Sequence, residues 1–136
     1  MISSNFTPDN YEKMLFLIFI FFIVILPIPI IKIVLGSILY FKTPKMNRYF
    51  GFRTKKAYFN DDTWFYSNNL FGKIFFYSGI IETILFIPLI IFIMPFTPWI
   101  FILLEMVTAI TSVVGVIVVN IKLGKLISQK YEENKI

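Results

Sequence analysis

The sequence predicts an all-α integral membrane protein. We expect three transmembrane helices, a basic cytoplasmic loop between the first two, and an interfacial helix leading into the second span. Apolar residues make up 57% of the 136 residues and the mean hydropathy is +0.77, well above the values of a soluble domain. Three nearly uncharged runs reach the roughly 20 residues that cross a bilayer core. The basic residues lie between and after these runs, which is typical of cytoplasmic loops.

The first span is predicted over about residues 14–41. It opens with 18 uncharged residues, Met14 to Ile31. A cleaved signal peptide is the rival interpretation, but the preceding residues are not a basic cluster and no small-x-small cleavage site follows. Pro27 and Pro29 are expected to kink or unwind this helix near its middle. That break would either be a packing kink or line a substrate site.

The second and third spans are predicted at about residues 74–94 and 99–121, and each contains one acidic residue, Glu82 and Glu105. Ionisable groups at bilayer depth cost roughly 2.5 to 3.5 kcal/mol each, so they need a partner or a function. With a rise of about 1.5 Å per residue, Glu82 is level with Lys32 of the first span, whereas Glu105 is not. We predict a Lys32–Glu82 ion pair that holds the first two spans in register. A proton or ligand site and snorkelling of Lys32 are the alternatives.

The third span also carries small polar residues at helical spacings of three and four. Such residues mark the face of a transmembrane helix that packs against its neighbours. They share the helix with Glu105 and are expected to face inward: Thr108, Thr111, Ser112 and Gly115.

The loops predict the orientation. The connection between the first two spans, residues 42–73, holds seven Lys and Arg, and the tail after the third span holds four. The turn Pro95–Pro98 between the second and third spans is uncharged. Because short basic loops stay in the cytoplasm, we expect a multi-pass cell-membrane protein with its N-terminus outside and its C-terminus in the cytoplasm.

The residue types that are missing exclude several chemistries. The sequence has no Cys and no His, which rules out disulfide frameworks, Cys/His zinc sites, thiol chemistry and a Ser-His-Asp triad. We therefore expect no enzyme activity, no catalytic residues, no cofactor and no bound metal. A net charge of +5 on so apolar a chain indicates a bilayer with anionic lipids at its inner face as partner, rather than nucleic acid.

The basic loop is too aromatic for a flexible linker. Its rings are expected to bury themselves at the headgroup layer while its cations meet lipid phosphates. The rings are Phe50, Phe52, Tyr58 and Phe59, and the cations are Arg48, Arg53, Lys55 and Lys56. Asn60 is a natural N-cap followed by two acidic residues, which predicts the start of the interfacial helix.

Residues 44–73 also carry a family resemblance. The residues that carry this resemblance are, in chain order, Asn47, Arg48, Gly51, Arg53, Thr54, Trp64, Asn68 and Gly72. It resembles the signature of the SdpI/YfhL family, small bacterial membrane proteins whose founding member gives immunity to a sporulation-delaying peptide toxin. Ala57 departs from the family pattern, which usually has Thr there, and the founding member's additional N-terminal spans have no counterpart here. The resemblance implies one family domain over residues 1–136.

Two interpretations of the motif stay open. Arg53 and Trp64 either anchor the loop at the interface and pack against each other, by a cation–π contact worth about 0.5 to 2 kcal/mol, or they line a polar cytoplasmic cavity with Thr54 and Asn68. The resemblance implies a membrane immunity protein of a Gram-positive-type cell that binds or sequesters a peptide toxin or bacteriocin. The alternatives are a signalling module that captures a soluble regulator, and a small transporter or channel subunit.

Overall fold

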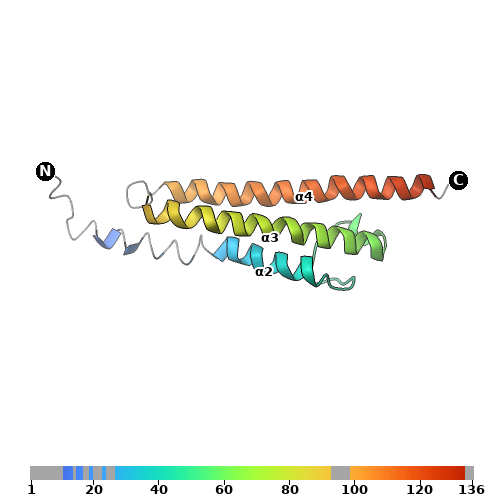
Figure 1. Cartoon of the computed structure of the whole chain (residues 1–136), viewed down its shortest axis with the longest axis horizontal. Coiled ribbons are helices and arrows are strands. Elements are labelled where there is room, and N and C mark those ends of the chain that lie inside the picture. The colour runs from blue at the N-terminus through green and yellow to red at the C-terminus, as the bar shows by residue number, and fades with distance from the viewer. Residues whose placement is uncertain are drawn as a thin grey trace.

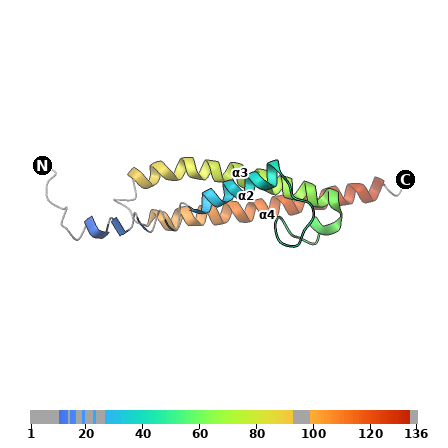
Figure 2. The same cartoon turned by 90° about the horizontal axis from the view of Figure 1, so that it is seen from below.

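The computed structural model describes residues 11–13, 15–16, 19, 23, 27–92 and 99–133. Its main elements are α2 (Pro27–Phe41), the 3-10 turn η2 (Ala57–Phe59), α3 (Asp61–Phe92) and α4 (Ile100–Glu133). All regular structure in the described residues is helical. Helices α3 and α4 run antiparallel along most of their length, and α4 continues beyond the start of α3 (Figure 1). The loop between α2 and α3 folds over this end of the bundle (Figure 2).

Among the described residues, two helices are long and apolar enough to cross a membrane. Their qualifying segments are Asp61–Leu89 and Ile102–Lys130, each of 29 residues. Helix α3 is continuous from Asp61 to Phe92, so the helix predicted after Asn60 leads into the second predicted span without a break. Its location at the membrane interface stays a prediction. Of the first predicted span, residues 14–41, the structure describes the 15-residue apolar helix α2. Much of residues 14–26 lies outside the described part of the chain. Of the three predicted spans, two are thus supported.

Pro27 and Pro29 of the predicted first span lie in the first turn of α2 as it is described, Pro27–Phe41. Residues 24–26, directly before them, lie outside the described part of the chain. The kink or unwinding expected at these prolines therefore stays a prediction. The predicted turn Pro95–Pro98 also lies outside the described residues.

The start of α3 is fixed by a reciprocal cap. Asn60 Oδ1 accepts a hydrogen bond from the Thr63 backbone N–H at 2.8 Å, and Thr63 Oγ1 accepts one from the Asn60 N–H at 3.0 Å. This arrangement is a capping box, which satisfies two backbone donors that a helix start leaves unpaired. Asp61 and Asp62 follow in the first turn, where the helix dipole favours negative charge. The predicted N-cap is therefore confirmed.

Glycines bring α2 and α3 into backbone contact. A Cβ added at Gly72 would lie 2.5 Å from the Tyr40 nitrogen, and one added at Gly79 would lie 2.8 Å from the Pro29 carbonyl oxygen. A Cβ at Gly36 would collide with the backbone nitrogen of Phe76. Small residues allow this approach in membrane helix pairs, where close packing replaces the hydrophobic effect as the driving force. The pairing of α2 with α3 thus depends on three positions that tolerate no side chain.

We expect Gly72→Ala to destabilise the bundle by about 1–3 kcal/mol, because the new methyl group must push two backbones apart. Gly115→Ala is the matched control, since its Cβ would meet side-chain atoms and no backbone, those of Ile74 at 3.1 Å and of Phe75 at 3.8 Å. Thermal unfolding in detergent measures both. Equal melting temperatures for the two variants would contradict the tight α2–α3 contact.

A small apolar core lies where the loop meets α3 and α4. Phe52 and Ala57 of the loop pack with Val119 and Leu123 of α4, and all four are at most 5% exposed. The partly buried residues that surround them are Leu70, Phe71, Ile74, Leu126 and Ile127. Phe52 was expected to bury its ring among lipid headgroups, but it is buried in protein, because α4 extends far enough to cover it.

Candidate binding site

Asn68 of α3 holds the loop to the helix. Its side chain is completely buried, and its Oδ1 accepts the Phe52 N–H at 2.6 Å. Its Nδ2 donates to the carbonyl oxygens of Trp64 at 3.0 Å and Phe52 at 3.5 Å. The adjacent Gly51 has a φ of 118°, which L side chains rarely adopt, and a Cβ there would collide with Asn68 Oδ1. One buried amide thereby satisfies loop backbone groups that have no secondary structure to pair with.

Trp64 lies one turn before Asn68 on α3 and is 2% exposed. Its Nε1 donates to the Pro44 carbonyl oxygen at 2.9 Å, and its ring packs against Tyr58 with 5.0 Å between centroids. A buried tryptophan needs a partner for its N–H, and Pro44 at the start of the loop supplies it. Trp64 therefore fixes both the beginning and the end of the loop.

Asn47 and Thr54 organise the loop from within. Asn47 Oδ1 accepts the N–H groups of Tyr49 and Phe50 at 2.9 and 2.8 Å, a local turn typical of asparagine. The Tyr58 hydroxyl donates to the Asn47 carbonyl oxygen at 2.7 Å. Thr54 Oγ1 accepts the N–H of Ala57 at 3.3 Å. We call Asn47 and Thr54, together with four buried or strained positions of α3 and the loop, the motif frame. Its members are Asn47, Gly51, Thr54, Trp64, Asn68 and Gly72.

The two motif arginines differ from the frame because their side chains are exposed. Arg53 Nη1 donates to the Arg48 carbonyl oxygen at 2.6 Å. Arg53 also lines a cavity of about 210 Å³ between α2, the loop and α3. The cavity is lined by Leu35, Leu39, Tyr49, Phe50, Gly51, Arg53, Phe71 and Phe75.

We call this cavity the arginine cavity. Its lining is mainly apolar and aromatic. Of the four residues expected to line a polar cavity, Arg53 lines it, whereas Trp64 and Asn68 lie buried in the frame and Thr54 caps the following turn. The ring that packs on Trp64 is that of Tyr58, while the Arg53 guanidinium contacts a backbone carbonyl.

The predicted ion pair inside the bundle is confirmed. Lys32 Nζ lies 2.6 Å from Glu82 Oε1, and both residues are 3% exposed. Thr111 of α4 joins the pair, since Lys32 donates to its Oγ1 at 2.9 Å and the Thr111 hydroxyl donates to Glu82 Oε1 at 2.5 Å. Lys32 also lies 5.4 Å from the centroid of the Phe75 ring. One polar cluster thus connects α2, α3 and α4.

Glu105 is separate from this cluster. Its Oε1 is buried without a hydrogen-bond partner among the described residues, as is the second oxygen of Glu82. The polar stripe of α4 lies partly inward as predicted, because Thr108 is 3% exposed and Thr111 reaches the ion pair. The sequence predicts that Thr111 lies on this face, but only the register between α3 and α4 brings its hydroxyl to Glu82.

Comparison with known proteins gives one decisive result. The family model described as the SdpI/YfhL protein family matches residues 43–120, which is more than half of the chain. The chain belongs to the SdpI/YfhL family. No curated protein and no solved structure matches it.

The SdpI/YfhL match covers the loop, all of α3 and most of α4. It therefore includes the whole motif frame, both arginines, Glu82 and Thr111. Helix α2 precedes the matched residues, so Lys32 lies outside them. In this chain the ion pair joins a helix outside the match to the family region.

Proposed function

We propose that this SdpI/YfhL family member is a membrane immunity protein that protects its cell against a membrane-active peptide toxin by binding or sequestering it. The single observation that supports this most strongly is the family match over residues 43–120. The two membrane-length helices agree with it, because such a toxin acts in the bilayer where these helices lie. The absence of Cys and His from the sequence favours action by binding over thiol or imidazole chemistry.

The arginine cavity is the site that suits a peptide ligand best. It offers an aromatic and aliphatic lining for one bulky apolar side chain, beside a guanidinium that donates to carboxylates or backbone carbonyls. Tyr49 is 91% exposed at its edge, and exposed aromatic residues next to arginine are typical of binding hot spots. In this proposal the motif frame sets the shape of the loop, while Arg53 and Tyr49 contact the peptide.

The experiment that tests the function is a gain of protection. A toxin-sensitive bacterium expresses the chain and is challenged with the sporulation-delaying peptide toxin and with any small secreted peptide encoded beside the gene. We expect survival to rise at least tenfold over cells with the empty vector for one of these peptides. Wild-type sensitivity to all of them, with the protein present in the membrane fraction, would contradict the proposal.

The proposed orientation places the loop and the end of α4 in the cytoplasm, because these segments hold most of the basic residues. Cysteine labelling tests it cleanly, since the sequence has no thiol. We expect Lys45→Cys to react with a membrane-impermeant maleimide only after the cells are opened. Labelling in intact cells would reverse the topology.

A further inference from the structure

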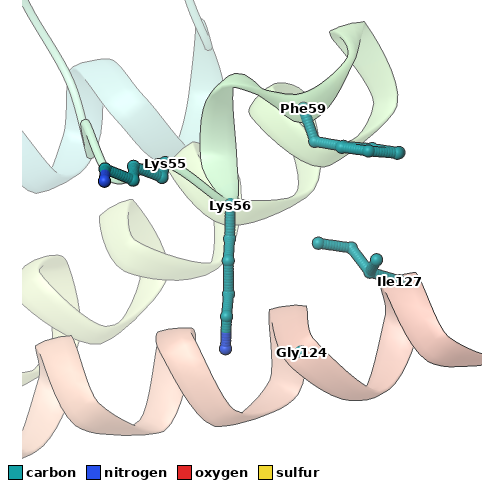
Figure 3. A pocket seen from close by; sticks show the side chains of 5 residues that line it. All are labelled: Lys55, Lys56, Phe59, Gly124 and Ile127. Atoms are coloured by element: carbon teal, nitrogen blue, oxygen red, sulfur yellow. The ribbon is translucent and has the colours of Figure 1, made fainter.

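A second cavity lies between the loop around η2 and α4, and it shares no lining residue with the arginine cavity. Its volume is about 370 Å³, and it is lined by Lys55, Lys56, Phe59, Gly124 and Ile127. The Lys56 side chain extends across the cavity toward α4, with Phe59 and Ile127 beside it, whereas Lys55 extends to the other side (Figure 3). We call it the lysine notch.

Gly124 makes room for the ammonium group. A Cβ added at Gly124 would lie 3.1 Å from Lys56 Nζ, so any larger residue there would displace the end of this side chain. Gly124 thus differs from Gly72, where the obstacle is backbone, because here only a flexible terminus occupies the space. The lysine notch is kept open by the one residue without a side chain.

The cation in the lysine notch has no acidic counterpart among the described residues. The only ion pairs described are Lys32–Glu82 and Lys130–Asp62, the second with 2.6 Å between Nζ and Oδ2. Asp62, an acidic residue at the start of α3, is therefore already paired with α4. Within the part of the chain that the structure describes, no acidic side chain lines the lysine notch. Two further exposed lysines, Lys122 and Lys125, lie close to Gly124 in the sequence of α4.

The position of the lysine notch points to an amphipathic anion. Gly124 and Ile127 belong to the last part of the membrane-length segment Ile102–Lys130, where a spanning helix reaches the headgroup layer. The walls formed by Phe59 and Ile127 are apolar, while the group directed into the space is a cation. A free anion would leave this apolar wall unused, whereas a lipid places its glycerol and first methylenes beside its phosphate.

We propose that the lysine notch binds the phosphate of one anionic phospholipid, with Lys56 as the phosphate contact and Phe59 and Ile127 against the glycerol region. This is a defined site, as distinct from diffuse attraction of the basic loop to the membrane surface. It depends on the chain lying in a membrane but not on the toxin proposal, so either proposal can fail alone.

The test measures lipid binding by the full chain in a neutral detergent with native mass spectrometry. The probe is short-chain phosphatidylglycerol, compared with short-chain phosphatidylcholine and with inorganic phosphate. We expect phosphatidylglycerol to bind with one-to-one stoichiometry and at least tenfold more tightly than phosphatidylcholine. Lys56→Gln and Gly124→Leu should each weaken this binding at least fivefold, the first by removing the cation and the second by filling the cavity without changing charge.

Lys45→Gln is the matched control, because it removes one exposed charge from the same loop away from the lysine notch. It should leave the affinity within twofold of the wild type. Equal losses for Lys45→Gln and Lys56→Gln, or unchanged binding by Gly124→Leu, would overturn the site in favour of diffuse attraction. Displacement of the lipid by inorganic phosphate at similar concentration would overturn the lipid as its ligand. Unchanged melting temperatures of the variants exclude misfolding as the cause of a loss.

Discussion

Glu82→Gln is expected to destabilise the bundle by about 3–5 kcal/mol, the typical cost of leaving one member of a buried ion pair without its partner. The change leaves the buried Lys32 ammonium with a neutral amide, the Thr111 hydroxyl and the Phe75 ring beside it, and with no carboxylate. Because the cluster joins three helices, the loss should affect the packing of α2 against α3 and of α3 against α4 together. Thermal or denaturant unfolding in detergent measures it.

The double variant Lys32→Met/Glu82→Gln distinguishes the net contribution of the ion pair to stability from the cost of leaving one of its charges unpaired. It leaves no unpaired charge in the membrane, so we expect it to be more stable than Glu82→Gln alone. Thr111→Val removes the third partner and should cost less than Glu82→Gln, because the charges still meet. Additive losses for Lys32→Met and Glu82→Gln would show that the two residues act independently.

Asn68→Ala is expected to release the loop from α3. The substitution leaves the Phe52 N–H without its side-chain acceptor, at a cost of about 1–3 kcal/mol for a buried group left unsatisfied. The Trp64 carbonyl keeps the Ser67 hydroxyl as a donor. The substitution also opens a cavity at a fully buried position. We expect faster proteolysis between residues 44 and 60 while α3 and α4 remain helical, measured by limited proteolysis and circular dichroism.

Asn68→Asp sharpens this test. The carboxylate keeps the acceptor for the Phe52 N–H but loses the donor to the Phe52 carbonyl oxygen and buries a negative charge, so it should still fail to hold the loop in the native arrangement. Ser128→Ala, which removes an exposed hydroxyl bonded only to its own helix at Gly124, is the control and should behave as wild type. Protease resistance of Asn68→Ala equal to that of Ser128→Ala would contradict the role of Asn68 as the link between loop and helix.

The features that local patterns determine were predictable from the sequence. The Asn60 cap and the long helix after it follow from local residue order, since capping depends on neighbours within three positions. The Lys32–Glu82 pair followed from depth, because two charges on adjacent spans are brought together when they lie at the same level of the bilayer. Both lie where expected.

The role of the motif residues could be assigned only from the tertiary structure. Trp64 and Asn68 carry the side chains that suggest ligand contacts, but their partners are backbone groups of Pro44 and Phe52, 20 and 16 residues away. Nothing in a local pattern identifies which distant carbonyl an indole N–H will meet. The burial of Phe52 likewise depended on the length of α4, which continues to Glu133. The apolar run of this helix ends near residue 121, so the sequence pattern does not show how far the helix continues.

The measurement that tests the account most directly is the survival of toxin-challenged cells that express Arg53→Lys. A planar guanidinium with five donors has a geometry that an ammonium cannot reproduce. Its exposed bond to the Arg48 carbonyl contributes only about 0.5–1.5 kcal/mol, so the variant should reach wild-type abundance in the membrane. We expect Arg53→Lys to lose protection, and Lys45→Arg in the same loop to keep it. Full protection by Arg53→Lys at equal abundance would contradict the arginine cavity as the site where the peptide binds.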